Sequence, residues 1–126
     1  MTGAWPRLLF AVAVALAVLQ SASAAPAVQF DGAYSGQRTV VRGGEPDCIK
    51  PGATTLKVQQ GVLTLTYARN AFDAQIGADV SFERTKLFNA GKSTVTASLK
   101  GRIMGRTMEA DLETHRCKYH YVLSRK

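Results

Sequence analysis

The chain has 126 residues and a formal net charge of +7, with 46% hydrophobic and 20% charged side chains. This is the length of one ordinary domain, which excludes a doubly wound α/β enzyme or an eightfold α/β barrel, because both need a far longer chain. A chain of this size buries one modest core and is only marginally stable without a covalent crosslink.

The first 24 residues have the pattern of a secretory signal. An unbroken apolar run of 12 residues, 8–19, follows Arg7, and Ala22 and Ala24 form an A-x-A cleavage pattern. As a helix this run would rise only about 18 Å, too short for a hydrocarbon core of about 30 Å, so a membrane anchor is the weaker interpretation. Cleavage after Ala24 would leave residues 25–126 as a single mature domain with 15 basic and 9 acidic side chains, a net charge of +6.

Short runs of alternating apolar and polar side chains follow in the mature chain. Residues 30–42 form the first predicted strand, and residues 45–52, which include two prolines, form a predicted loop. In residues 56–67 the alternation continues on both sides of Gln60-Gly61, which predicts a hairpin with a tight turn. A helix would instead place apolar residues three and four positions apart.

A further run, residues 72–84, is interrupted by Gly77, and a short run at 87–88 stops at residues 89–91. The last run, 117–123, places Cys117, Tyr119, Tyr121 and Leu123 on one face. Glycines inside strands mark bends or a close approach of two backbones, as at the corners of small barrels.

The clearest unit is a second predicted hairpin at residues 93–115. A turn at Met104-Gly105 would place Lys100 near Glu109 and Ser98 near Asp111. The acids at 109, 111 and 113 would then line the solvent-facing side of the sheet. Basic side chains on the facing strand would partly neutralise them, each opposite-charge pair contributing roughly 0.2–1 kcal/mol.

These elements predict an all-β fold, a small antiparallel barrel or sandwich of seven or eight short strands with one disulfide. Turn signals recur every 8–12 residues. Barrel and sandwich stay open as alternatives at this point, because the same strand pattern suits both.

Cys48 and Cys117 are the two cysteines of the chain. In an exported protein they predict one disulfide, which would tie the loop after the first strand to the start of the last strand. The alternative is a metal site made by His115, Cys117 and His120. On an extended strand residues 115 and 117 face one way and residue 120 the other, and a disulfide removes the thiolate that zinc requires. We therefore expect neither a metal nor another cofactor.

Catalytic motifs such as G-x-S-x-G, H-E-x-x-H, the P-loop or C-x-x-C do not occur. Glu109, Asp111 and Glu113 are spaced by about 7 Å, as in an inverting glycosidase. They alternate along an open strand face, however, without the burial that would separate their pKa values. The sequence therefore predicts a protein that is not an enzyme.

The basic side chains are spread along the chain rather than clustered with aromatic residues, which disfavours nucleic acid as a partner. The nearest approach to a basic patch is made by Arg102 and Arg106 around one turn and by Arg116 and Lys118 around Cys117. An anionic component of the cell envelope, or a protein, is the expected partner.

Two short motifs at the ends of the mature chain carry a resemblance. Residues 30–36 read F-D-G-A-Y-S-G and residues 117–123 read C-K-Y-H-Y-V-L. The chain resembles a group of small exported bacterial β proteins with F-D-G-x-Y-x-G near the start and C-x-Y-x-x-x-L at the end. That group carries no assigned activity, so the resemblance implies fold and compartment only. A weaker similarity is to periplasmic inhibitor barrels with one disulfide.

The favoured function is a non-enzymatic exported binding module of the cell envelope, periplasmic or secreted. If the first and last strands are neighbours, Tyr34, Tyr119 and Tyr121 would gather near the disulfide, Arg116 and Lys118. The rings are either core residues bonded to backbone carbonyls, or they line a pocket mouth for an anionic or glycan ligand. The alternative function is an inhibitor of a periplasmic or foreign hydrolase, which would present the loop at 45–52.

Overall fold

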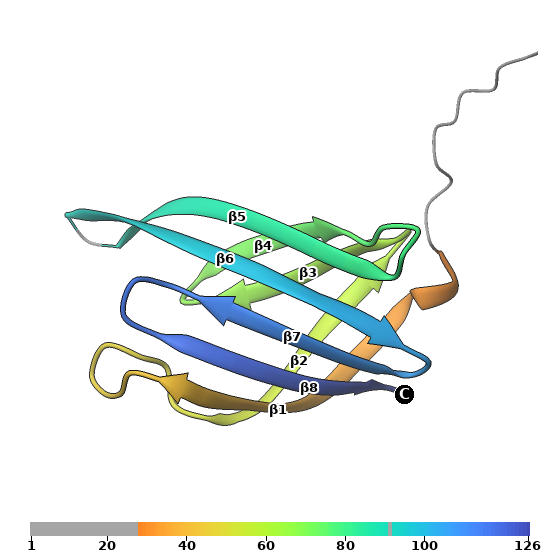
Figure 1. Ribbon diagram of the computed structural model, residues 1–126, viewed down its shortest axis with the longest axis horizontal. Coiled ribbons are helices and arrows are strands. Elements are labelled where there is room, and N and C mark those ends of the chain that lie inside the picture. The colour runs from red at the N-terminus through yellow and green to blue at the C-terminus, as the bar shows by residue number, and fades with distance from the viewer. Residues whose placement is uncertain (1–27, 91) are drawn as a thin grey trace, which may run out of the picture.

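The computed structural model describes residues 28–90 and 92–126, which form strands over most of their length (Figure 1). The expected signal, residues 1–24, lies outside the described residues. One 3-10 turn, η1 (Val28–Phe30), precedes the strands. The eight strands are β1 (Gly32–Arg42), β2 (Gly52–Gln59), β3 (Val62–Tyr67), β4 (Asn70–Gln75), β5 (Ser81–Ala90), β6 (Ser93–Met104), β7 (Thr107–Glu113) and β8 (Lys118–Arg125). The predicted all-β fold class is confirmed.

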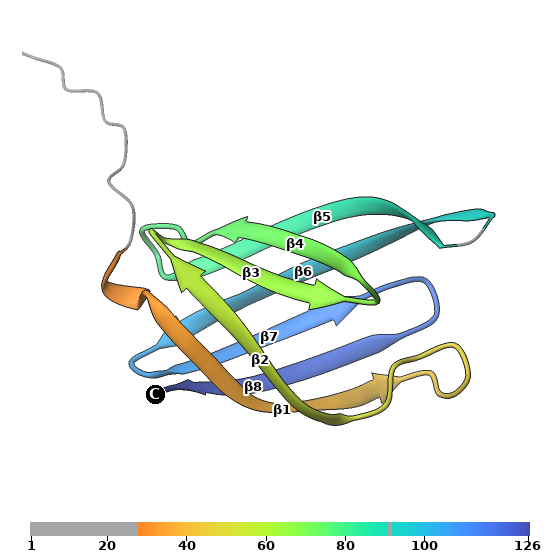
Figure 2. The ribbon, with the colours of Figure 1, turned by 180° about the vertical axis from the view of Figure 1, so that it is seen from behind.

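The strands form one antiparallel sheet in the order β4-β3-β2-β1-β8-β7-β6-β5. Two four-stranded meanders, β1–β4 and β5–β8, are joined by the pairing of β1 with β8, so the predicted neighbourhood of the first and last strands is confirmed. The sheet curls until its edge strands β4 and β5 lie side by side (Figure 2). There Lys86 Nζ donates to the carbonyl oxygen of Ala71 at 2.6 Å. The result is a nearly closed barrel.

Two tight turns fix the register of the hairpins. Gln60 and Gly61 both have positive φ, 53° and 76°, which is the type I′ geometry that suits a two-residue hairpin and confirms the turn predicted there. In the β6–β7 hairpin the positive φ falls on Gly105, at 64°, so Gly105 is the first of the two central residues. The turn is therefore centred one residue later than the sequence suggested.

This displacement changes the charge pairs across β6 and β7. Lys100 lies opposite Asp111, Arg102 opposite Glu109, and Ser98 opposite Glu113. The predicted neighbours, Lys100 with Glu109 and Ser98 with Asp111, are wrong, because moving a hairpin turn by one residue moves the register by two. The acids still face outward, since a shift of two residues preserves the face of a strand.

The segment between β3 and β6 also differs from the prediction. The expected run 72–84 covers parts of two strands, β4 and β5, separated by residues 76–80, and the expected short run at 87–88 lies within β5. Val80 has a φ of 61°, which β-branched residues rarely adopt. Asp79 Oδ1 accepts hydrogen bonds from the amide and the hydroxyl of Ser81, which fixes the connection.

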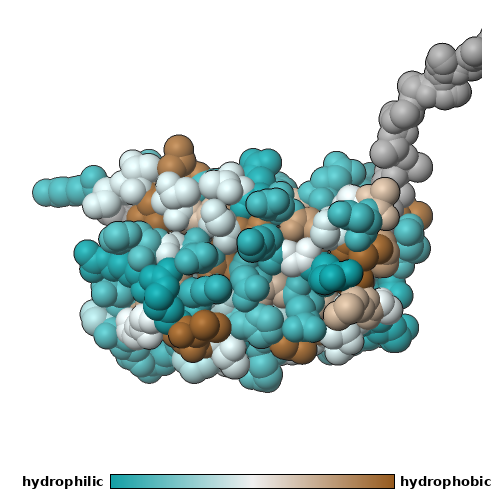
Figure 3. All heavy atoms as spheres, in the orientation of Figure 1, coloured by the Kyte–Doolittle hydropathy of each residue, from teal (hydrophilic) through white to brown (hydrophobic). Residues whose placement is uncertain are grey.

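The core fills the inside of the barrel with the inward-facing members of each strand. β7 is typical, because Met108, Ala110 and Leu112 are buried while Glu113 is exposed. The outer face of β5–β8 is mostly hydrophilic, with scattered apolar side chains (Figure 3). Each strand therefore divides its period-two pattern between an apolar interior and a polar exterior.

Buried tyrosines make the barrel sensitive to alkaline pH. Burial raises the pKa of Tyr121 from its ordinary value of 10.0 to about 12, although the nearby Arg38 opposes this, and burial also raises the pKa of Tyr67. Because the unfolded chain loses these protons first, stability is unaffected below about pH 10 and falls as the pH rises from there through the folded-state values.

We expect Tyr121 alone to account for a loss on the order of 2 kcal/mol by about pH 12. Urea unfolding of the parent and of Tyr121→Phe, at about pH 9 and about pH 11.5, measures this effect. The parent should lose more stability than the variant between the two values. Equal losses would contradict the assignment.

Candidate functional site

The three tyrosines singled out by sequence, Tyr34, Tyr119 and Tyr121, are all buried inside the barrel. The Tyr34 hydroxyl donates to the carbonyl oxygen of Phe30 at 2.8 Å. Tyr119 lies opposite Val40, six residues further along β1 and thus about 20 Å from Tyr34. The expectation that all three gather beside the disulfide is wrong for Tyr34. Direct contact of these rings with a ligand stays a prediction.

Tyr119 lies at the end of the barrel where the disulfide forms. Its hydroxyl accepts a hydrogen bond from the amide of Ile49 at 2.9 Å and contacts the Tyr67 hydroxyl at 3.0 Å. The Tyr67 and Tyr119 rings meet edge to face, with centroids 5.3 Å apart. Ile49 directly follows Cys48, so the tyrosine pair anchors the β1–β2 loop to the barrel interior.

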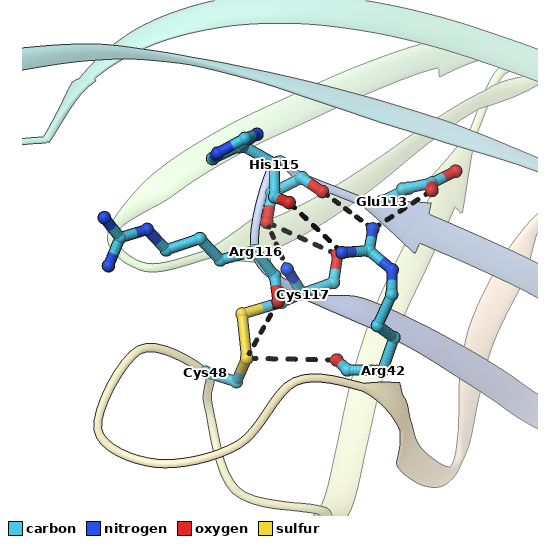
Figure 4. A network of polar contacts seen from close by, with 7 residues as sticks. Arg42, Cys48, Glu113, His115, Arg116 and Cys117 are labelled. Atoms are coloured by element: carbon cyan, nitrogen blue, oxygen red, sulfur yellow. Dashed lines mark hydrogen bonds and ion pairs between the residues drawn. A yellow bond between two sulfur atoms is a disulfide. The ribbon is translucent and has the colours of Figure 1, made fainter.

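The disulfide between Cys48 and Cys117 is formed, as predicted, with a Cα–Cα distance of 5.7 Å. Figure 4 shows that Arg42, at the end of β1, reaches the connection between β7 and β8 next to it. Its guanidinium donates to Glu113 Oε2 and to the carbonyl oxygens of residues 114 and 115, each at 3.1 Å. One arginine and one disulfide thus hold the β1–β2 and β7–β8 loops together.

Of the two basic residues predicted beside Cys117, Arg116 is the exposed one. It projects outward from the polar network, as does His115 (Figure 4). Arg116 Nη1 lies 3.2 Å from Asp47 Oδ1, an ion pair that bridges the same two loops. Lys118 is half-buried and lies opposite Glu113 of β7. Arg116 therefore belongs to the rim of this end of the barrel, while Lys118 belongs to the sheet.

A recess with a volume of about 700 Å³ opens at this end. Tyr67, Phe88, Val95 and Cys117 provide its apolar lining, and the Phe88 ring packs edge-on against Tyr67 with centroids 6.2 Å apart. Its polar margin is made by Asp47, Ser93, Thr94, Thr96, Thr114, His115 and Arg116. Apolar surface inside and charged side chains at the rim are the usual composition of a ligand site.

The recess exists because neighbouring hairpins differ in length. β4 has 6 residues and β5 has 10, so the β5–β6 hairpin projects past the β3–β4 turn (Figures 1 and 2). Phe88 and Val95 lie on this projecting part and are only partly buried. Sequence reasoning missed both, together with Tyr67. The signal that could have found them is the difference in strand length, which the interruption at residues 76–80 concealed.

A second hollow, of about 790 Å³, lies on the outer face of β5–β8. His120 contacts two of its acids, because Nδ1 lies 2.9 Å from Asp111 Oδ1 and Nε2 lies 3.3 Å from Glu109 Oε1. Lys100 and Arg102 lie opposite these two acids on β6. The histidine contacts and the strand register place bases beside acids within the sheet, so we assign the hollow to cross-strand pairing.

The loop proposed for an inhibitor, residues 45–52, borders the recess. Residues 43–47 are all exposed, and the disulfide at Cys48 and the ion pair of Asp47 with Arg116 hold them in place. A loop fixed in this way would lose little conformational entropy on binding a partner. Inhibition of a hydrolase stays a prediction.

The geometry of the described residues also bears on other classes of function. Among residues 28–90 and 92–126, no group of three His, Cys, Asp or Glu side chains is arranged to hold a metal ion. Over the same described residues, no helix has the length and apolar character needed to cross a bilayer. Comparisons with protein-family models, with curated proteins and with solved structures found no match to this chain, so the resemblance to small exported β proteins stays a prediction.

Proposed function

We propose that the protein is a non-enzymatic binding module of the cell envelope, periplasmic or secreted, and that its site is the recess at the disulfide end of the barrel. One observation carries this proposal: a hollow of about 700 Å³ with an apolar lining and a polar margin lies beside the buried, inward-facing side chains of the core. A ligand would therefore bind at the mouth of the barrel rather than inside it.

The lining indicates the chemistry of the ligand. Tyr67, Phe88 and Val95 offer apolar and aromatic surface, which favours an apolar group. Arg116 at the rim keeps 68% of its side chain exposed despite its ion pair with Asp47, so it stays accessible to a negatively charged group. The ligand class is therefore an apolar group that carries a negative charge.

Export is supported by the disulfide. Disulfides form and persist in the periplasm and outside the cell, whereas cytosolic thiols are kept reduced. The Cys48–Cys117 bond shapes the wall of the recess, because Cys117 lines it and Cys48 holds the loop that contains Asp47. The same bond thus supports export of the protein and shapes the proposed site.

Anilinonaphthalene sulfonate is a suitable probe, since it combines aromatic rings with a sulfonate. The folded parent should bind it at one site and respond with increased fluorescence. Val95→Asp places a carboxylate on the recess wall and should weaken binding by about tenfold or more. Val122→Asp is the matched control, because Val122 is an exposed valine on the outer face of β8.

The control should bind as the parent does. The proposal fails if the folded parent does not bind the probe, or if both substitutions weaken binding equally. Circular dichroism of each variant verifies that the barrel is intact.

A further inference from the structure

One wall of the recess is a strand edge that extends past its neighbour. β6 begins at Ser93, whereas its pairing with β7 begins at Ser98, opposite Glu113. The chain leaves the sheet at Thr114, whose amide bonds to the carbonyl oxygen of Cys117 at 2.8 Å in the turn toward β8. Within the described part of the chain, residues 93–97 therefore pair with β5 alone.

The backbone groups of Thr94 and Thr96 point to this open edge. In an antiparallel ladder, successive residues direct their N–H and C=O groups alternately to the two neighbours. The two-residue turn between β6 and β7 is closed by Met104 and Thr107, so the even-numbered residues of β6 face β7. Thr94 and Thr96 continue that series past the end of β7. Both residues also line the recess.

We infer that this edge accepts an extended, acidic peptide segment of a partner protein, which adds as a further strand beside residues 93–97. This inference rests on the proposed function and names the kind of partner. An extended backbone repeats donors and acceptors at the spacing that the edge presents, which is the basis of β-strand addition. Every second side chain of the added strand would point into the recess, toward Tyr67 and Phe88.

The charge of the surrounding loops selects an acidic segment. Four connections meet at this end of the barrel: β1–β2, β3–β4, β5–β6 and β7–β8. With the strand ends beside them they carry six basic side chains against three acidic ones, an excess of three positive charges. The basic residues are Arg42, Lys50, Arg69, Lys92, Arg116 and Lys118, and the acidic residues are Glu45, Asp47 and Glu113. Such an excess attracts acidic partners and speeds their association.

A pair of substitutions at Thr96 isolates the backbone contact. Thr96→Pro removes an amide that faces the open edge, where proline is tolerated, and leaves the β5–β6 ladder intact. Thr96→Ala removes the same side chain but keeps the amide. The probe is a blocked heptapeptide in which glutamates alternate with valine and phenylalanine, and the comparison peptide has lysine in place of glutamate.

The parent and Thr96→Ala should bind the acidic peptide with similar affinity, measured by fluorescence anisotropy, and Thr96→Pro should bind it at least about tenfold more weakly. The lysine peptide should not bind. Independently of any variant, the peptide should slow amide hydrogen exchange at Thr94 and Thr96 of the parent. This readout holds even where Thr96→Pro proves unfolded by circular dichroism.

Each other result overturns the inference. Equal binding of both peptides would contradict the preference for an acidic segment. Unchanged amide hydrogen exchange at Thr94 and Thr96 would contradict strand addition. Loss of a homodimer in Thr96→Pro, seen by sedimentation, would identify a second copy of the chain as the occupant instead. Binding of anilinonaphthalene sulfonate without binding of the peptide would overturn this inference while leaving the proposed function standing.

Discussion

Replacing both cysteines by serine should lower the free energy of unfolding by about 4 kcal/mol. The Cys48–Cys117 bond spans 69 positions of sequence, so its loss returns a large loop-closure entropy to the unfolded chain. Both residues are buried, and the loss therefore also removes packing where the two loops meet. Urea unfolding of the parent and of the double variant, followed by circular dichroism, measures the difference.

The reduced parent is the matched control for the double variant. With dithiothreitol present, the parent should unfold at nearly the urea concentration of the double variant, because both lack the crosslink. Thiol titration of the native parent should detect no free thiol at Cys48 or Cys117. Unchanged stability of the double variant would contradict the stabilising role. Tyr119 and Arg42, which anchor the same loops, would then be sufficient.

The period-two pattern predicted most of the fold, because burial on one face of a strand is encoded in each short run. The alternation at 56–67 and at 117–123 corresponds to β2, β3 and β8, with the apolar members inside. The pairing of the first and last strands followed from the two cysteines and from the closure of a barrel. The strands could be predicted because their alternation is visible within a few residues. The neighbourhood of the first and last strands could be predicted because a single disulfide links the segments beside them.

Register and strand boundaries could be predicted less well, because they depend on the backbone angles of single turn residues, which residue type determines only weakly. Gly105, rather than Met104, begins the β6–β7 turn, and this difference moved every charge pair across the hairpin by two residues. Val80 keeps the apolar alternation of its run yet has a positive φ, so the alternation continued through a connection between strands.

The recess could not be predicted from local patterns at all. Tyr67, Phe88 and Val95 come from three strands and meet because β5 and β6 project past the β3–β4 turn. Their residue types suit a core as well as a ligand site, and only the difference in strand length leaves Phe88 and Val95 partly exposed beside the buried Tyr67. The sequence did indicate this end of the barrel, however, through Arg116 beside Cys117.

The barrel depends on close backbone contact where β1 meets β8, and Gly36 is the residue that permits this contact. A Cβ atom at Gly36 would lie 2.1 Å from the carbonyl oxygen of Val122 and 2.9 Å from the Cα of Leu123. These are main-chain atoms of the neighbouring strand, so a rotamer change cannot relieve the overlap. The pairing that joins the two meanders must therefore shift when a side chain is added.

Gly36→Ala should consequently destabilise the barrel by about 3 kcal/mol, the cost of forcing an added methyl group into a packed site. Gly44→Ala is the matched control, because a Cβ atom at Gly44, in the exposed β1–β2 loop, would meet no atom within 4 Å. Its effect should stay within about 0.5 kcal/mol, as for most surface substitutions. Urea unfolding of both variants beside the parent measures the contrast. Equal stability of the two would mean that β1 and β8 can separate without cost, and that the contact at Gly36 does not hold the two meanders together.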